Sequence, residues 1–156
     1  MQENKKEQVE QRIVNHVNVE LIPAFVAVTE MNAKRILIVD DESDICFVLE
    51  KALGAFMIDS YEDPLLALEN FKPHSYNLVI LDIKMPGLNG FALYREIRRL
   101  DKEVKICFLT AVEPTPYNGV YSDIFSSIPA NCVIRKPIEN EEMMKRINEI
   151  IYDTNR

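Results

Sequence analysis

The stretch that decides the fold is Arg35-Ile36-Leu37-Ile38-Val39-Asp40-Asp41. Its apolar run is uninterrupted and rich in β-branched side chains, and it ends abruptly in two carboxylates. Such a run, bounded by polar residues, is typical of a short strand buried on both faces of a parallel sheet. Apolar residues at helical spacing follow between Ile45 and Leu53, and we expect Gly54 to end that helix. The stretch therefore predicts the first unit of a strand–helix repeat.

The strand–helix unit recurs along the chain. We expect four further strands at residues 56–58, 78–81, 104–109 and 132–134. Asp63 and Pro64 have the residue types of a helix N-cap and a first helical position. Apolar side chains at helical spacing predict three more helices. The first carries Leu65, Leu68 and Phe71, and the second carries Leu93, Ile97 and Leu100. The third carries Met143, Ile147, Ile150 and Ile151.

The alternation of strands and helices predicts an α/β fold, a three-layer (βα)5 arrangement with a doubly wound parallel sheet. Three prolines and a glycine break the region 113–130, where we expect only one short helix, near 117–126. We place this domain at residues 34–153. Residues 1–33 do not follow the pattern and are treated as an N-terminal extension of uncertain order. Met31 lies shortly before the first strand, which raises the hypothesis that translation starts there.

The composition excludes several classes of protein. The 156 residues suit one domain, and 25 acidic against 18 basic residues give a formal charge of -7. This charge argues against binding to nucleic acid or to an anionic membrane. We find no membrane span and no signal peptide. The three cysteines lie apart in apolar runs, as expected for buried, reduced thiols in a cytoplasmic protein.

Polar residues follow four of the predicted strands. Asp40 and Asp41 follow the first strand, Asp82 the third, Thr110 the fourth and Lys136 the fifth. The carboxyl ends of parallel strands share one edge of the sheet, where ligands bind. If the strand order is 2-1-3-4-5, the carboxylates converge and repel one another until a cation enters or some of them bind protons. Oxygen ligands of this kind favour Mg²⁺, beside which a carboxylate can act as a nucleophile toward a phosphoryl group.

Four segments together resemble the receiver domain of two-component response regulators: Val39-Asp40-Asp41-Glu42, Leu81-Asp82-Ile83-Lys84-Met85-Pro86-Gly87-Leu88-Asn89-Gly90, Leu109-Thr110-Ala111 and Arg135-Lys136-Pro137. The resemblance extends from about Lys34 to Tyr152. Each segment is common by itself, but the four in this order and at these spacings are specific. The resemblance implies a flavodoxin-like fold with strand order 2-1-3-4-5. It also implies a signalling phosphoacceptor similar to the chemotaxis regulators. Such a protein is not an enzyme, beyond its own autophosphorylation and autodephosphorylation.

The resemblance implies roles for the acidic residues. Asp82 corresponds to the phosphoacceptor. Asp41, Asp82 and the main-chain carbonyl of Lys84 correspond to the direct ligands of Mg²⁺, and Asp40 corresponds to a ligand that acts through water.

The resemblance also implies how phosphorylation is sensed. Thr110 is similar to the hydroxyl residue that moves toward the phosphoryl group, and Lys136 to the lysine that contacts this group. The Lys136–Pro137 bond is a candidate cis peptide. The chain departs from the family at Val133, where an aromatic residue usually reports the movement of the hydroxyl. Three aromatic residues are candidates to replace it: Tyr117, Tyr121 and Phe125.

We therefore expect a single-domain response regulator without an output domain, because the chain ends soon after the fifth helix. A sensor histidine kinase or a phosphotransfer protein would supply the phosphoryl group. A downstream target, or a second copy in a homodimer, would bind the face of the fourth helix, fifth strand and fifth helix. The alternative is a degenerate receiver that acts as an interaction module without phosphorylation. A phosphatase with an aspartate nucleophile is disfavoured, because such enzymes usually have a second acidic residue two positions after the nucleophile. This chain has Lys84 at that position. Flavin mononucleotide is disfavoured because its phosphate would meet Asp40 and Asp41.

Overall fold

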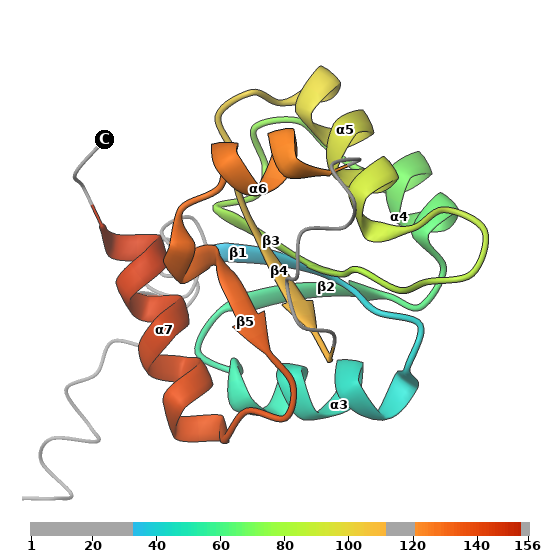
Figure 1. Ribbon diagram of the computed structural model, residues 1–156. Helices are drawn as coiled ribbons and strands as arrows, with labels where there is room; N and C mark the ends of the chain where they lie inside the picture. Colours follow the sequence, from blue (N-terminus) through green and yellow to red (C-terminus); the bar gives the residue numbers. More distant parts are fainter. Residues whose placement is uncertain (1–32, 112–120, 154–156) are drawn as a thin grey trace, which may run out of the picture. The chain divides into compact units, whose positions relative to one another are not determined.

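The computed structural model describes residues 33–111 and 121–153 (Figure 1). The fold given below is that of the compact unit that starts at Lys34. The strands are β1 (Arg35–Val39), β2 (Met57–Tyr61), β3 (Leu78–Asp82), β4 (Lys105–Thr110) and β5 (Val133–Arg135). The helices are α3 (Ser43–Ala52), α4 (Pro64–Asn70), α5 (Gly90–Leu100), α6 (Ser122–Ser127) and α7 (Asn140–Tyr152). Among these described helices, none is long and apolar enough to cross a membrane.

The sheet is parallel throughout, with its strands in the order β2-β1-β3-β4-β5. Helices α3 and α7 pack together on one face, and α4 and α5 pack together on the other (Figure 1). The predicted doubly wound, three-layer fold and its strand order are therefore confirmed. Because all strands run in the same direction, their carboxyl ends lie at one edge of the sheet. Leu81, the residue before the end of β3, is paired with Val39 of β1 on one side and Phe108 of β4 on the other.

The central strands form the core, because helices cover them on both faces. Residues Ile36 to Val39 of β1 and all of β3 are buried, which explains their uninterrupted apolar sequences. Helix α5 adds Phe91, Leu93 and Ile97 to this core. The three cysteines are buried as reduced thiols, as predicted.

The edge strand β2 differs most from its prediction. It starts at Met57 and continues to Tyr61, three residues beyond the predicted end. Four of its five side chains are half-buried. A strand with only one neighbour can carry polar residues such as Asp59 and Ser60, and these interrupt the apolar run that marks a central strand. Strands β4 and β5 each begin and end one residue later than predicted.

The helices show smaller differences. Helix α6 begins at Ser122, and the first part of the helix predicted at 117–126 lies outside the described residues. Leu65 and Leu100 were expected on buried faces, but 55% and 49% of their surfaces are exposed. Helix α4 has only seven residues, and it buries Pro64, Ala67 and, at its C-cap, Phe71. The N-cap prediction is confirmed, since Asp63 Oδ1 accepts a hydrogen bond of 2.8 Å from the backbone N–H of Leu65.

Candidate functional site

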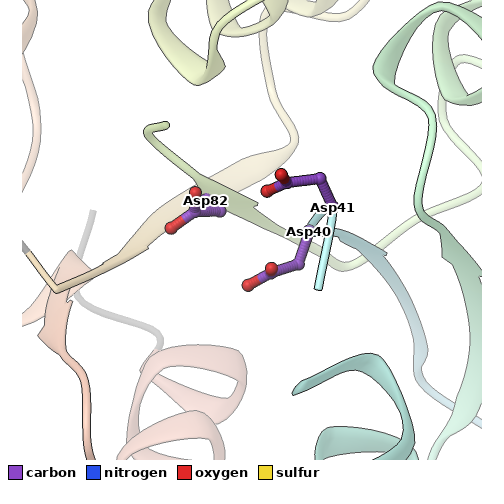
Figure 2. Close-up of side chains that lie close together, drawn as sticks. All are labelled: Asp40, Asp41 and Asp82. Atoms are coloured by element: carbon purple, nitrogen blue, oxygen red, sulfur yellow. The ribbon is translucent and has the colours of Figure 1, made fainter. Parts of the chain in front are cut away.

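Three carboxylates converge at the carboxyl ends of β1 and β3. Asp40 and Asp41 follow β1 and Asp82 ends β3, and one oxygen of each lies within 4.8 Å of the other two (Figure 2). The parallel register explains this convergence, because Val39 and Leu81 are paired neighbours and the chain continues from each into an aspartate. Asp40 and Asp82 are buried, while Asp41 is exposed. The predicted convergence of these three side chains is therefore present in the fold.

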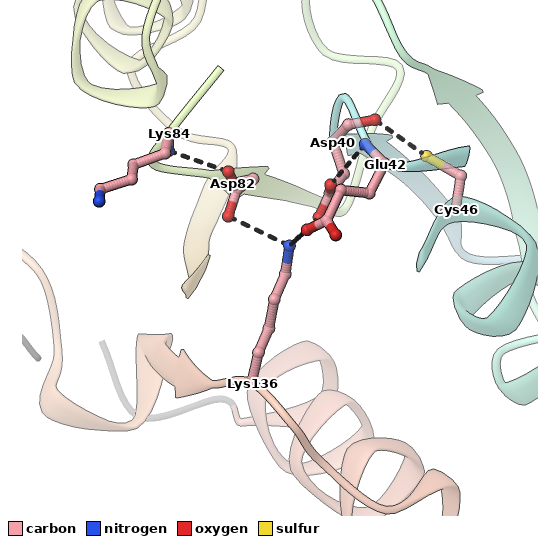
Figure 3. Close-up of polar contacts among 6 residues, drawn as sticks. All are labelled: Asp40, Glu42, Cys46, Asp82, Lys84 and Lys136. Carbon is pink, nitrogen blue, oxygen red and sulfur yellow. Dashed lines mark hydrogen bonds and ion pairs between the residues drawn. The ribbon is translucent and has the colours of Figure 1, made fainter. Parts of the chain in front are cut away.

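Lys136 supplies the positive charge of the site. Its Nζ lies 2.6 Å from Asp40 Oδ2, 3.0 Å from Glu42 Oε1 and 3.3 Å from Asp82 Oδ1 (Figure 3). Its backbone N–H donates a hydrogen bond of 2.9 Å to the carbonyl oxygen of Thr110, which holds the segment after β5 beside the end of β4. The Lys136–Pro137 peptide bond is cis, as the resemblance implied.

One oxygen of each buried carboxylate is fixed by the backbone. The N–H of Glu42 donates to Asp40 Oδ1 at 3.0 Å, and the N–H of Lys84 donates to Asp82 Oδ2 at 2.9 Å (Figure 3). The Cys46 thiol also donates to the main-chain carbonyl of Asp40. The second oxygen of each carboxylate, Oδ2 of Asp40 and Oδ1 of Asp82, faces the Lys136 ammonium.

The charges at the site are unbalanced. Burial raises the pKa of Asp40 and of Asp82 above the usual range, although contact with Lys136 opposes this effect. Burial alone would lower the pKa of Lys136, but its hydrogen bonds with Asp40 and Glu42 and the charges of Asp40 and Asp82 raise it. The ammonium is thus strongly stabilised, whereas burial disfavours the charged form of the two carboxylates that share it.

Asp41, Asp82 and Lys136 line a cavity of about 250 Å³. Its lining residues are Asp41, Glu42, Asp82, Lys84, Thr110, Ala111 and Lys136. Thr110 is buried at the end of β4, so the sheet edge brings together the residues that the sequence predicted for the metal and phosphoryl site: Asp40, Asp41, Asp82, Lys84, Thr110 and Lys136. Carboxylate and carbonyl oxygens around a space of this size are donors that suit Mg²⁺.

The loop after β3 brings backbone close to the cavity. Gly87 has a φ of 76°, a conformation that suits glycine, and the Gly90 N–H donates to the Ile83 carbonyl at 3.0 Å. Asn89 caps α5, because its side-chain oxygen accepts a hydrogen bond from Ala92 N–H. The loop thus turns sharply and returns to the end of β3.

Val133 occupies β5 and is half-buried, paired in register with Phe108 of β4. Two of the aromatic residues proposed in its place pack against Phe91 of α5. The Tyr121 ring stacks on Phe91 with centroids 4.1 Å apart, and the Phe125 ring meets Phe91 edge-on at 5.3 Å. The third candidate, Tyr117, lies outside the described residues.

Sequence reasoning missed Glu42 as a partner of Lys136. The two residues are 94 positions apart, and a flexible glutamate side chain carries no sequence signal for such a contact. A glutamate at the N-cap of a helix, where Ser, Thr, Asp or Asn is preferred, is the single hint that the sequence offers.

Comparison with known proteins agrees with this geometry. The response regulator receiver domain family matches residues 36–148. Chemotaxis protein CheY of Bacillus subtilis is 30% identical over 124 residues, which cover 76% of this chain and 98% of CheY. The uncharacterized transcriptional regulatory protein YkoG of the same organism is 33% identical over 119 residues, which cover 75% of this chain and 50% of YkoG. The chain spans about half the length of YkoG and of two further transcriptional regulators that it resembles.

Solved structures show the same relationship. The response regulator TrrA from Thermotoga maritima, in complex with Mg²⁺-BeF, has 34% identity and a TM-score of 0.60, covering 75% of this chain and 98% of TrrA. The non-phosphorylated HemR receiver domain from Leptospira biflexa has 25% identity and a TM-score of 0.67, covering 79% and 98%. Receiver domains are signalling modules of two-component systems that typically bind Mg²⁺ through acidic residues and interact with kinases and downstream targets. The chain described here belongs to the response regulator receiver domain family.

Proposed function

We propose that this chain is a phosphoacceptor of a two-component system, in which Mg²⁺-dependent phosphorylation of Asp82 switches its contacts with other proteins. The observation that supports this most directly is the position of Lys136. Its ammonium lies between two buried carboxylates, those of Asp40 and Asp82, at 2.6 and 3.3 Å. A lysine in this place can pass from the carboxylates to an incoming phosphoryl group without leaving the cavity.

The donor set fits Mg²⁺. Asp41, Asp82 and the main-chain carbonyl of Lys84 would bind the ion directly, and Asp40 would bind it through water. These are oxygen donors, few in number, as Mg²⁺ prefers in sites where it also contacts phosphate. When bound, the ion would neutralise the carboxylates and allow a doubly charged phosphoryl group to approach.

The transfer itself needs one nucleophile. A carboxylate oxygen of Asp82 attacks the phosphorus of a phosphohistidine, the O–P bond forms as the N–P bond breaks, and the electron pair remains on the donor imidazole. Lys136 then binds one phosphoryl oxygen, and the Thr110 hydroxyl donates a hydrogen bond to another. The donor would be a sensor histidine kinase or a phosphotransfer protein. All three buried cysteines are thiols and not disulfides, which supports a cytoplasmic location for this exchange.

The signal would leave through the face that α6, β5 and α7 form. A downstream target or a second copy of the chain would bind there. Tyr121 and Phe125, which contact Phe91 in α5, would report the movement of Thr110 in place of an aromatic residue at Val133.

A degenerate receiver is the second candidate, and Val133 favours it. A half-buried valine paired with Phe108 offers no ring that can turn between exposed and buried positions. Such a chain would bind its partner equally well with and without phosphorylation.

The test is phosphorylation by acetyl phosphate in the presence and absence of Mg²⁺, followed by intact-mass spectrometry. We expect one phosphoryl mass increment that requires Mg²⁺, is lost in Asp82→Asn and is kept in Asp44→Asn, an exposed aspartate of α3. An increment that persists in Asp82→Asn would contradict the assignment of the acceptor. No increment in the unmodified chain would favour the degenerate receiver.

A further inference from the structure

Lys136 has three carboxylate partners, and one of them differs from the others. The side chains of Asp40 and Asp82 are 1% and 7% exposed, whereas that of Glu42 is 62% exposed. Glu42 lines the cavity of about 250 Å³ and also the adjoining cavity of about 450 Å³ between α3 and α7. It therefore stands at the rim of the site, outside the group of acids at the strand ends.

The backbone of Glu42 is fixed while its side chain remains free for Lys136. Its N–H donates to Asp40 Oδ1, and its carbonyl accepts hydrogen bonds from the N–H groups of Ile45 and Cys46 at the start of α3. In the part of the chain that the structure describes, its side chain makes no capping hydrogen bond with α3 and accepts instead from Lys136 Nζ at 3.0 Å (Figure 3). The N-cap position is thus used for a long-range contact.

This contact has a consequence for cation binding, because Mg²⁺ and the Lys136 ammonium are attracted to the same carboxylates. If Asp40 and Asp82 were the only partners of Lys136, an entering ion would have to displace the ammonium without compensation. Glu42 gives the ammonium a partner outside the ion's donor set. We propose that Glu42 is a positioning residue that draws Lys136 aside and so strengthens Mg²⁺ binding. This inference rests on the proposed function, since it assumes that the three aspartates bind Mg²⁺.

A double-mutant cycle tests the inference, with Mg²⁺ affinity measured by isothermal titration calorimetry on the full chain. The variants are Glu42→Gln, Lys136→Met and the double variant, and Glu62→Gln is the matched control. Glu62 is an exposed glutamate after β2 that is not among the carboxylates paired with Lys136. Circular dichroism verifies that each variant is folded.

We expect Glu42→Gln to weaken Mg²⁺ binding at least about fivefold, and the same change to have less than about a twofold effect in the Lys136→Met background. Glu62→Gln should change the affinity by less than about twofold. If Glu42→Gln weakens Mg²⁺ binding equally in both backgrounds, the Glu42 charge acts on the ion directly. That result would overturn the role of Lys136 in this inference. No loss on Glu42→Gln in the unmodified background would also overturn it. If the unmodified chain binds no Mg²⁺, the proposed function fails and this inference with it, an outcome distinct from the previous two.

Discussion

The backbone of Gly90 at the start of α5 packs directly against that of Asp82 at the end of β3. A Cβ atom at position 90 would lie 3.0 Å from the carbonyl carbon of Asp82 and closer still to its carbonyl oxygen. The sheet and α5 can therefore approach as they do only because residue 90 has no side chain. The position of the proposed phosphoacceptor thus depends on a glycine eight residues further along the chain.

Gly90→Ala should consequently destabilise the fold and disturb Asp82. We expect a loss of about 1–3 kcal/mol in the free energy of unfolding, the usual cost of overpacking, together with slower phosphorylation by acetyl phosphate. Urea denaturation and intact-mass kinetics measure the two effects. Gly54→Ala is the control, since its Cβ would meet only backbone oxygens at 3.6 Å, an ordinary contact distance. Equal stability of the two variants would contradict the packing argument.

Asp82→Asn should stabilise the metal-free protein at neutral pH and abolish its response to Mg²⁺. Burial raises the pKa of Asp82 in the folded state, so its contribution to stability is present at low pH and is lost as the pH rises through the folded-state pKa. An uncharged amide avoids that loss. In the unmodified chain, Mg²⁺ at a hundred times its dissociation constant should add about 2.7 kcal/mol to the free energy of unfolding. Thermal melts with and without MgCl₂ measure both effects, and a variant that melts lower without the ion would refute the first.

Asp59→Asn should reduce the dependence of stability on acid pH. The Asp59 carboxylate accepts hydrogen bonds of 2.9 and 3.1 Å from the Arg35 guanidinium and one of 2.8 Å from the Tyr76 hydroxyl. The hydrogen bonds from Arg35 lower the pKa of Asp59, so the stability it contributes is present at neutral pH and is lost as the pH falls through the folded-state pKa.

Because Asp59 and Arg35 are partly exposed, the expected cost of Asp59→Asn at pH 7 is only about 1 kcal/mol. The cost should shrink at an acid pH below the folded-state pKa of Asp59, where the carboxylate of the unmodified chain is protonated as well. Urea denaturation at both pH values measures the difference, with the exposed Asp44→Asn as control. A cost that is the same at the two pH values would show that charge is not its origin.

Lys105→Met should loosen the end of α7. The Lys105 ammonium, at the start of β4, donates to the carbonyl oxygens of Ile150 in the last turn of α7 at 2.6 Å and of Asp153, its C-cap residue, at 2.9 Å. We expect a loss of about 1 kcal/mol and faster amide hydrogen exchange in the last turn of α7. Lys102→Met, at an exposed position before β4, is the control and should leave exchange in α7 unchanged. Unaltered exchange in Lys105→Met would refute this role.

The strands and the edge of the sheet that carries the acids could be predicted from backbone regularity, and the family resemblance implied the strand order that makes β1 and β3 neighbours. Continuous apolar runs mark β1 and β3, and parallel pairing then brings Asp40, Asp41 and Asp82 together. The full length of β2 could not be predicted, because an edge strand needs no continuous apolar run. The family resemblance implied a role for Lys136 before its contacts were known.

Contacts made by long side chains were beyond sequence reasoning. Nothing in the order of residues indicates that Glu42 reaches Lys136, or that Lys105 reaches the end of α7, because rotamers and distant packing decide both. The exposure of Leu65 could not be predicted for a related reason. Helical spacing indicates which side chains share one face of α4, but not how much of that face its neighbours bury.

The pairing of Val39 with Leu81 has a consequence for how the chain tolerates insertions and deletions. The acids follow these residues directly, so no flexible loop separates the core from the site. One residue added to or removed from β1 or β3 would turn the aspartate at its end to the opposite face of the sheet. Changes in chain length should therefore be accepted in the turns around Gly54 and Ser75, which lie at the other edge of the sheet, and rejected within the strands themselves.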